Sequence, residues 1–395
     1  MDIVVQKFGG TSVSSDENRR LVVNKIKCVI EKGYKTVVVV SAMGRNGSPY
    51  ATDTLLSLVD EEFKVNNPRG LDLLMSCGET LSTVVMCNNL LKEGIEAVPL
   101  MGGEAGIKTD DNFNNASILH VDPKSILKVL EDGKVPVVAG FQGISTGGSI
   151  TTIGRGGSDV TGAILGAALK AREVQIYTDV DGIMTADPRI VSEASLIENI
   201  SYDEVFQFAD QGAKVIHPRA VEISRRYNIP LVIKNTLSDC DGTTISTCGE
   251  NNERIITGIT HMENRVQIRI SNNSKKHCND IFKTLAEEGI SIDLISVFLK
   301  DQIFTISNYD LEKFKKIGVD LDIKYEYTEN CSKISIIGSK MRGIPGVMSR
   351  ILKALEEGNV DVLQTADSHT TIWCLVESDK VKCAINLLHN EFNLG

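Results

Sequence analysis

The chain has 395 residues, which predicts two or three domains, each large enough to bury a core. Its net charge of −10 argues against nucleic acid or an anionic membrane surface as a partner, because both favour clustered Lys and Arg. The longest apolar run, TVVVVSAM at 36–43, is far shorter than the roughly 20 residues that span a bilayer. Nine scattered cysteines contain no C-x-x-C pair and indicate reduced thiols. We therefore expect a cytoplasmic protein.

Strands and helices alternate from residue 1 to about residue 236, which predicts an α/β domain with a mainly parallel sheet and helices on both faces. The expected strands are apolar almost throughout, as strands buried on both faces should be. They are DIVVQKF (2–8), KTVVVVSA (35–42), IEAVPL (95–100), KVPVVAGF (134–141), EVQIYT (173–178) and IPLVIKN (229–235). Helical patterns cover 71–91 and 158–170 between them.

A lysine followed by two glycines ends the first predicted strand, in KFGGTS at 7–12. A Walker A loop has its lysine after the glycines, and a dinucleotide fingerprint needs G-x-G-x-x-G, so neither pattern fits. Open α/β sheets bind ligands at the carboxyl ends of their strands, where Gly9 and Gly10 would turn N–H groups toward a phosphate. Lys7 would add a compact positive charge. An ordinary turn after a strand-end lysine explains these residues equally well.

A second glycine-rich loop, TIGRGGSD at 152–159, precedes the predicted helix 158–170. Ser158 or Asp159 is suited to cap this helix, and Arg155 offers a planar group for a carboxylate or phosphate. In LMSCGETL (74–81), Glu79 lies among apolar residues of a predicted helix and needs a partner there. The residues alone favour an internal Lys or Arg over a substrate ammonium.

The stretch YTDVDGIMTADPRIV (177–191) follows a strand and contains several aspartates. It lacks the third acidic position and the distal Glu of an EF-hand loop, which disfavours a calcium site. Contacts to the ribose and phosphates of a nucleotide are one interpretation of Asp179, Asp181, Asp187 and Arg189, and ordinary surface turns are the other. GAKVIHPRAVE (212–222) adds Lys214 near a helix start, where His217 is expected to cap or pack. No histidine has the spacing of a metal ligand.

After residue 235 the chain becomes polar and rich in turns, which indicates a domain boundary. Two similar passages follow, at 264–297 and 332–365, each a strand, a loop, a helix ending in E-E-G and a second strand. Their period of about 70 residues suggests two ferredoxin-like βαββαβ units that regulate or dimerise. We expect a catalytic domain at 1–236, a linker at 237–257 with a possible first strand of the nested pair, and repeats at 258–330 and 331–395.

Taken in order, the motifs resemble those of aspartate kinases, which belong to the amino-acid kinase superfamily. They are KFGGTS, VVSAMG (39–44), SCGETLS (76–82), VAGFQG (138–143), TTIGRGGSD (151–159), IYTDVDGIMTADPR (176–189) and GAKVIHPRA (212–220), followed by two ACT-like repeats. The resemblance implies a three-layer αβα sandwich followed by two ACT domains. It also implies ATP-dependent phosphorylation of the β-carboxylate of L-aspartate to 4-phospho-L-aspartate, the first step of lysine, threonine and methionine biosynthesis.

The resemblance also implies roles for individual residues. Lys7 and Asp159 would be catalytic, and Ser41, Glu79, Arg155 and Ser158 would bind aspartate. The nucleotide would contact Lys7, Phe8, Gly9, Gly10, Thr178, Asp179, Met184, Arg189 and Lys214. Mg²⁺ would accompany ATP, held by phosphates and water and not by a protein cage. Which of Ser48, Thr52 or Thr54 in the loop after Met43 meets substrate is left open.

The same resemblance implies an amino-acid effector at the ACT domains and a homodimer formed through them. Lysine is the favoured effector and threonine the alternative. Other members of the superfamily, such as glutamate 5-kinase, acetylglutamate kinase or UMP kinase, are alternative activities. A non-catalytic amino-acid sensor is a further alternative, which the joint presence of Lys7, Arg155 and Asp159 disfavours.

Overall fold

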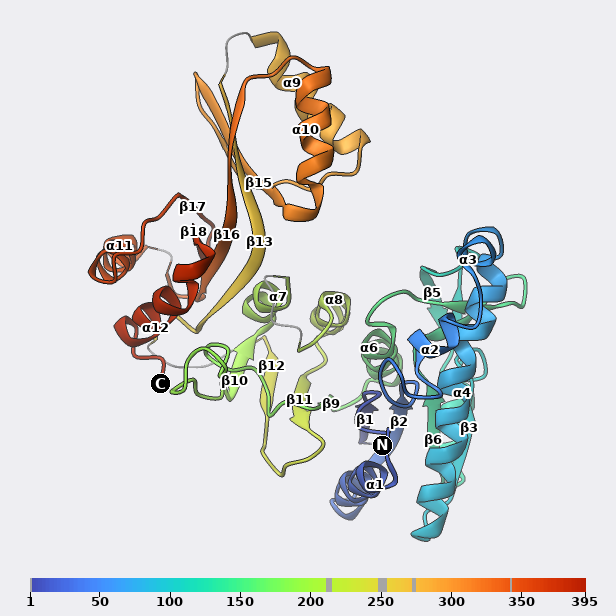
Figure 1. Ribbon diagram of the computed structural model, residues 1–395. Coiled ribbons are helices and arrows are strands. Elements are labelled where there is room, and N and C mark those ends of the chain that lie inside the picture. Colours follow the sequence, from blue (N-terminus) through green and yellow to red (C-terminus); the bar gives the residue numbers. More distant parts are fainter. Residues whose placement is uncertain (1, 211–214, 248–253, 272–274, 342) are drawn as a thin grey trace. The chain divides into compact units, whose positions relative to one another are not determined.

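The computed structural model describes residues 2–210, 215–247, 254–271, 275–341 and 343–395 (Figure 1). The chain forms two compact units, and each is described by itself. Unit 1 contains Met1–Ile183, Leu196–Ala209 and Lys214–Asn251. Unit 2 contains Met184–Ser195, Asp210–Ala213 and Asn252–Gly395.

Unit 1 is built on an eight-stranded sheet that includes all six predicted strands. The strand order is β10 (Asn199–Ser201), β12 (Thr243–Ser246), β11 (Leu231–Asn235), β9 (Glu173–Thr178), β1 (Ile3–Phe8), β2 (Lys35–Val40), β6 (Val135–Ala139) and β3 (Ala97–Leu100). All neighbours are parallel except β11 and β12. Every residue of β1 is buried, because this strand lies in the middle of the sheet and is covered on both faces.

Helices cover both faces of this sheet, so the predicted three-layer arrangement is confirmed. The helices of unit 1 are α1 (Asp16–Glu31), α2 (Thr52–Leu56), α3 (Glu61–Asn66), α4 (Pro68–Lys92), α5 (Lys124–Glu131), α6 (Gly157–Leu169), α7 (Tyr202–Asp210) and α8 (Pro218–Tyr227). Of these, α2 and α3 pack mainly against α4. Phe8 of β1 packs with Val22 and Ile26 of α1 and with Met86 of α4. The next residue back, Lys7, faces the opposite side, where a Cβ on Gly162 of α6 would lie 3.4 Å from its Cβ.

A second, four-stranded sheet belongs to unit 1 and leads into the glycine-rich loop before α6. Its strand order is β5 (Ile118–Val121), β4 (Ile107–Thr109), β7 (Gln142–Ser145) and β8 (Ile150–Thr152). Strand β8 ends five residues before α6 begins, so its position sets the start of that loop.

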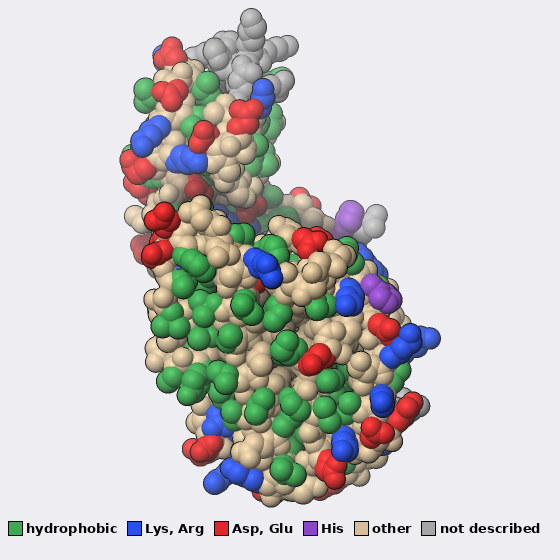
Figure 2. Space-filling model, turned by 90° about the vertical axis from the view of Figure 1, so that its right-hand side faces the viewer, with side chains coloured by type: hydrophobic (Ala, Val, Ile, Leu, Met, Phe, Trp, Pro, Cys, Tyr) green, Lys and Arg blue, Asp and Glu red, His purple; other side chains and the backbone are tan. Residues whose placement is uncertain are grey.

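Helix α4 is long and apolar, and among the described residues it alone has the length and composition of a membrane span. Its inward face nevertheless buries two carboxylates, Asp72 and Glu79, together with Ser82 and Thr83. Buried polar groups of this kind are typical of a core helix that holds a site and are costly in lipid. Figure 2 shows hydrophobic side chains spread over the face of unit 1 that carries α4.

Unit 2 contains one six-stranded sheet in which two long strands are shared by two halves. The strand order is β14 (Asp293–Val297), β15 (Asp301–Ser307), β13 (Gly258–Ser271), β16 (Tyr325–Ile337), β18 (Thr371–Glu377) and β17 (Gln364–Asp367). Its helices are α9 (Lys275–Glu287), α10 (Leu311–Asp320), α11 (Val347–Glu357) and α12 (Val381–Glu391). Each half has its own apolar core, one around Phe304 and Phe314 and the other around Ile334 and Ile351.

The two halves of unit 2 are nested in the chain. The beginning of β13, Gly258–Met262, pairs with Lys333–Ile337 of the second half, whereas its end, Arg265–Ser271, pairs with β15 of the first half. The strand that enters the first repeat therefore also completes the second repeat.

Residues 184–195 belong to unit 2, although they follow Ile183 of unit 1, which lies five residues beyond the end of β9. Ala186 and Val191 lie in the core of the second half, and the N–H of Ile259 in β13 donates to the Thr185 carbonyl at 2.7 Å. This segment thus makes a covalent link from the end of β9 into the core of unit 2.

Candidate active site

The end of the central strand β1 carries the predicted catalytic lysine. Lys7 Nζ lies 2.6 Å from Asp159 Oδ1 in α6, and the side chains of Lys7 and Asp159 are only 11% and 14% exposed. Two residues that are 152 positions apart in the chain therefore form one nearly buried ion pair. Its cation has a fixed position at the carboxyl edge of the sheet, where ligands of such folds bind.

The two glycines after Lys7 serve different purposes. A Cβ on Gly10 would lie 2.7 Å from the carbonyl oxygens of Ala42 and Gly44, so only glycine allows this approach of the two strand ends. The N–H of Gly9 donates to the Tyr177 carbonyl at 3.2 Å. The expectation that the Gly9 N–H faces a phosphate is therefore wrong, because this N–H is hydrogen-bonded to β9.

Phe8 is fully buried and stacks on Tyr177 with ring centroids 4.6 Å apart. Its side chain belongs to the core between the sheet and helices α1 and α4, so any nucleotide contact of Phe8 would be made by its backbone. Among the described residues, no hydrogen-bond acceptor contacts the N–H of Gly10.

The second glycine-rich loop enters α6 through a left-handed residue. Gly156 is the N-cap of α6 with φ +69°, and a Cβ there would lie 2.2 Å from the ring of His217. The prediction of Ser158 or Asp159 as N-cap is wrong, because the turn at Gly156 caps the helix two residues before Ser158, and the helix starts at Gly157. Asp159 lies in the first turn of α6 and its carboxylate is paired with Lys7.

Arg155 lies at the exposed tip of this loop. In the part of the chain that the structure describes, its guanidinium has neither an ion pair nor a hydrogen bond, so it is available to a ligand. Ser158, by contrast, is buried, and a Cβ on Gly140 would lie 2.7 Å from its Oγ.

Glu79 of α4 is 3% exposed and reaches the chain just after β2. Its Oε1 accepts a hydrogen bond from the Ala42 N–H at 3.2 Å, whereas its buried Oε2 has no hydrogen-bond partner. Burial raises the pKa of Glu79 to about 8. The interpretation that favoured an internal Lys or Arg is not borne out, since no ion pair found among the described residues includes Glu79.

Ala42 connects Glu79 with the Lys7 side of the site. The Ala42 carbonyl oxygen is one of the atoms that exclude a Cβ at Gly10, while its N–H binds Glu79. Ser41, the preceding residue, donates its N–H to the Phe8 carbonyl at 3.1 Å and is half-buried. The ends of β1 and β2 thus bring Lys7, Ser41 and Glu79 to one edge of the sheet.

Asp179 follows β9 at this same edge. Arg45 Nη2 lies 2.7 Å from Asp179 Oδ2, and Thr178 Oγ1 donates to Asp179 Oδ1 at 3.1 Å. Arg45 belongs to the loop after Met43 and was not among the predicted site residues. A basic residue four positions after Ser41 was the only signal that could have found it.

His217 is the N-cap of α8, and its Nδ1 accepts a hydrogen bond from the Arg219 N–H at 3.3 Å. The predicted capping role is confirmed. Burial lowers the pKa of this imidazole, which favours the neutral ring that can accept. Lys214, three residues earlier, lies outside the described residues.

Met184 and Arg189 belong to unit 2. Arg189 Nη2 is 2.6 Å from Asp187 Oδ2, and this pairing lowers the pKa of Asp187. The contribution of these two residues to nucleotide binding stays a prediction. No group of three His, Cys, Asp or Glu side chains within the described ranges is placed to hold a metal ion.

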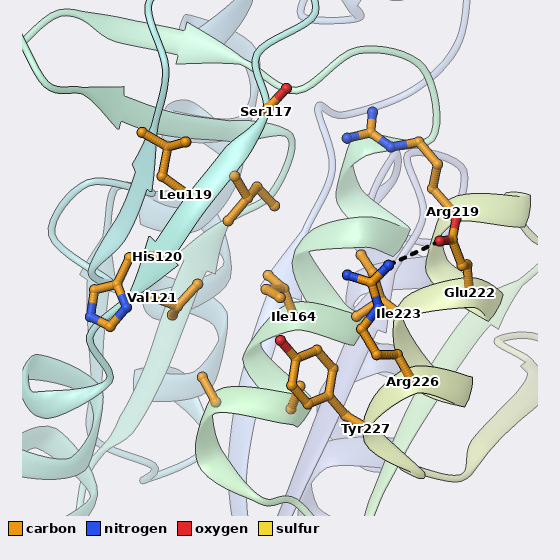
Figure 3. Close-up of a pocket in the computed structure, with 13 residues that line it drawn as sticks. Ser117, Leu119, His120, Val121, Ile164, Arg219, Glu222, Ile223, Arg226 and Tyr227 are labelled. Atoms are coloured by element: carbon orange, nitrogen blue, oxygen red, sulfur yellow. Dashed lines mark hydrogen bonds and ion pairs between the residues drawn. The ribbon is translucent and has the colours of Figure 1, made fainter.

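A pocket of about 420 Å³ lies between β5, α6 and α8 of unit 1 (Figure 3), and neither Lys7 nor Glu79 lines it. Arg219, Arg226, Glu222 and Tyr227 line its α8 side. Arg219 Nη1 also donates to the Ile153 carbonyl in the glycine-rich loop at 2.7 Å, so α8 helps to hold that loop.

Comparison with known proteins agrees with this arrangement. Residues 2–235 match the amino acid kinase family and residues 326–390 match the ACT domain. The chain is 44% identical to aspartokinase 1 of Bacillus subtilis over 403 residues, covering 100% of both chains. It is 36% identical to the aspartokinase of Geobacillus stearothermophilus, covering 100% of this chain and 98% of that one.

Solved structures show the same likeness. The Clostridium acetobutylicum aspartate kinase has a TM-score of 0.81 at 25% identity, and the match covers 99% of this chain and 100% of that chain. E. coli aspartokinase III in complex with aspartate and ADP has a TM-score of 0.75 at 25% identity over 99% and 100% of the two chains. The chain therefore belongs to the aspartokinases of the amino acid kinase family.

Proposed function

We propose that this enzyme transfers the γ-phosphoryl group of ATP to the β-carboxylate of L-aspartate and releases 4-phospho-L-aspartate and ADP. The observation that carries the proposal is the pairing of two unlike groups at one sheet edge. Lys7 is a fixed cation held by Asp159, and Glu79 is a buried carboxylate with an oxygen that lacks a partner. A phosphoryl donor needs the first group, and an amino-acid acceptor with an ammonium needs the second.

The aspartate side of the site is formed by α4 and the loop before α6. The substrate ammonium binds Glu79 and completes the hydrogen bonding of Oε2, which favours the ionised carboxylate and lowers the pKa that burial has raised. Arg155 binds a substrate carboxylate, and Ser41 and Ser158 add hydrogen bonds. These contacts set the position of the β-carboxylate relative to the phosphoryl group.

The chemical step needs no general base. A β-carboxylate with an ordinary pKa near 3.9 is already ionised at neutral pH, so positioning and charge neutralisation supply the catalysis. Lys7 Nζ stabilises the charge that develops on the transferred group, and Asp159 keeps this ammonium in place.

The nucleotide binds near the ends of β1 and β9, with Gly10, Thr178 and Asp179 as contacts. Phe8, Met184, Arg189 and Lys214 complete the set that we assign to ATP, and Gly9 is left out because its N–H is bound to the Tyr177 carbonyl. Mg²⁺ accompanies the nucleotide, but the described residues offer no three-ligand protein site for it, so no step is assigned to the ion.

Unit 2 is proposed to bind an amino-acid effector, with lysine favoured over threonine, and to form a homodimer. E. coli aspartokinase III, with a TM-score of 0.78 at 25% identity, has been solved in complex with lysine and aspartate in a T-state. Residues 184–195 pack in the core of the second repeat and continue along the chain from the segment after β9. We propose that effector binding at the second repeat alters the end of β9 through this segment. We further propose a cytoplasmic location and, along the chain, a catalytic region at 1–236, a linker at 237–257 and repeats at 258–330 and 331–395. The compact units depart from this division, because β12 (Thr243–Ser246) lies in the sheet of unit 1 and residues 184–195 belong to unit 2.

A coupled assay of ADP release tests the proposal. The expected result is ADP release that depends on L-aspartate and is absent with L-glutamate, N-acetylglutamate or UMP. Lysine is expected to lower the rate or raise the KM for aspartate, and threonine is the comparison. Release with another acceptor, or none with aspartate, would refute the catalytic proposal. A rate unaffected by either amino acid at saturation would refute the regulatory one.

A further inference from the structure

We infer that Asp72 of α4 is a positioning residue of the active site. It holds the glycine-rich loop that carries Arg155 at a fixed distance from Glu79. The inference deepens the proposed function and rests on it for the identity of the substrate. No residue of the LMSCGETL motif other than Glu79 was predicted to act in the site, and Asp72 precedes that motif by two residues.

Asp72 is completely buried, yet within the described part of the chain no Lys or Arg forms an ion pair with it. Its Oδ2 accepts from the Thr152 N–H at 2.8 Å, and its Oδ1 accepts from Thr152 Oγ1 at 2.6 Å. The Asn114 N–H lies 3.0 and 3.1 Å from the two oxygens. Both oxygens are thus satisfied by neutral donors, which is unusual for a carboxylate without a cation.

These donors belong to the two segments that support the glycine-rich loop. Thr152 ends β8 and is followed directly by Ile153, Gly154 and Arg155. Asn114 precedes Asn115, and a Cβ on Gly154 would lie only 2.6 Å from Asn115 Oδ1. One carboxylate therefore fixes both the start of the loop and the segment against which Gly154 rests.

Asp72 and Glu79 are seven residues apart in α4, which is about two helical turns, so they lie on the same face of one rigid helix. Glu79 presents its free oxygen at the site, and Asp72 anchors the loop that carries Arg155. The helix thereby sets the spacing between the two groups that we assign to the ammonium and the carboxylate of aspartate. An error of about 1 Å in such a spacing is enough to reduce activity strongly.

The test compares Asp72→Asn and Thr152→Val with a matched control, Thr36→Val. Thr36 is also buried and its Oγ1 donates to Gln6 Oε1 at 2.9 Å, but it pairs with Val4 near the opposite end of β1 from Lys7. Asp72→Asn sets an amide N–H₂ against one of the backbone or hydroxyl donors. Thr152→Val removes a single hydrogen bond and keeps the side-chain shape.

Steady-state kinetics give the first measurement. We expect Asp72→Asn to raise the KM for aspartate about tenfold and Thr152→Val about threefold, with the KM for ATP changed less than twofold. Thr36→Val should leave both constants unchanged. Equal effects of all three variants, or a loss of melting temperature without a shift in the aspartate KM, would assign Asp72 to the stability of the fold alone.

Hydrogen exchange gives a second measurement that does not depend on the reaction. Amides of residues 150–157 should exchange faster in both test variants than in the Thr36→Val control, while those of 3–8 in β1 stay protected. If the unmodified enzyme released no ADP with aspartate, the proposed function would fail, and exchange in 150–157 would still decide the role of Asp72. Unchanged exchange there would overturn the inference.

Discussion

Each half of the active site contains a carboxylate with little exposure to solvent, and only one of the two is paired with a cation. Asp159 of α6 has a cation 2.6 Å away in Lys7, so its charge is compensated without a ligand. Glu79 of α4 is more deeply buried and has one hydrogen bond and a free oxygen. A protein tolerates such an uncompensated group where a ligand supplies the missing partner. We call the side with Lys7 and Asp159 the preformed half of the site. The side with Glu79, which the substrate completes, is the open half.

Removing the cation from the preformed half should have the largest effect. Lys7→Met is expected to lower kcat about a thousandfold, because it removes a charge from the transferred phosphoryl group. It also leaves the nearly buried Asp159 without its cation, which should lower the free energy of unfolding by about 3 kcal/mol. ADP release and thermal unfolding measure the two effects.

The double variant Lys7→Met with Asp159→Asn separates these two effects. It should regain most of the lost melting temperature, because the orphaned charge is gone, and should remain inactive. Recovery of activity in the double variant would contradict the catalytic role of Lys7.

Removing the charge of Glu79, in the open half, should weaken the binding of aspartate and should not reduce the stability of the fold. Glu79→Gln is expected to raise the KM for aspartate about 30-fold, within the range for losing a charged hydrogen bond. Its melting temperature should stay equal or rise, because a carboxyl that is costly to ionise is removed. Glu93→Gln, which removes the exposed Lys27–Glu93 pair just beyond α4, is the control and should change neither. A clear loss of stability in Glu79→Gln would mean that Glu79 has an internal partner.

The carboxyl of Glu79 should also make the stability of the fold and the KM for aspartate depend on pH. Its pKa is 4.5 in the unfolded chain and about 8 in the folded protein. Between these values the unfolded chain has released the proton and the folded protein retains it, so the free energy of unfolding falls as pH rises. The substrate ammonium favours the ionised form, so the KM for aspartate should fall with rising pH, by up to about tenfold per unit.

Titrating the KM for aspartate and the melting temperature from about pH 6 to about pH 8, in the unmodified enzyme and in Glu79→Gln, checks both directions. Both slopes should flatten in the variant. Parallel slopes in the two proteins would assign the pH dependence to other groups.

The smallest effect is expected at the rim of the preformed half. Arg45 and Asp179 form an exposed pair, with side chains 71% and 43% exposed, and such pairs contribute little to stability. Arg45→Ala should raise the KM for ATP about threefold and change the free energy of unfolding by less than about 0.5 kcal/mol. An effect confined to the aspartate KM would place Arg45 on the other side of the site.

The sequence alone predicted the main strands of unit 1 and the two long helices that carry the site. Apolar strands buried on both faces have a strong local signature, so all six predicted strands appear in the sheet. The short strands β10 and β12 were missed, because three or four residues carry too little pattern. The N-cap of α6 was also missed, since a left-handed glycine replaces the usual side-chain cap.

The order of the motifs was sufficient to identify the family and to name Lys7, Asp159, Glu79 and Arg155 as candidates. Tertiary structure alone decided how those residues are satisfied. In the folded chain Lys7 is paired with Asp159, and the Gly9 N–H is hydrogen-bonded to β9. Glu79 has an oxygen without a hydrogen-bond partner, and residues 184–195 lie in the core of unit 2. Residue type and spacing specify which groups are present, whereas burial and hydrogen-bond partners depend on segments that are far apart in the chain.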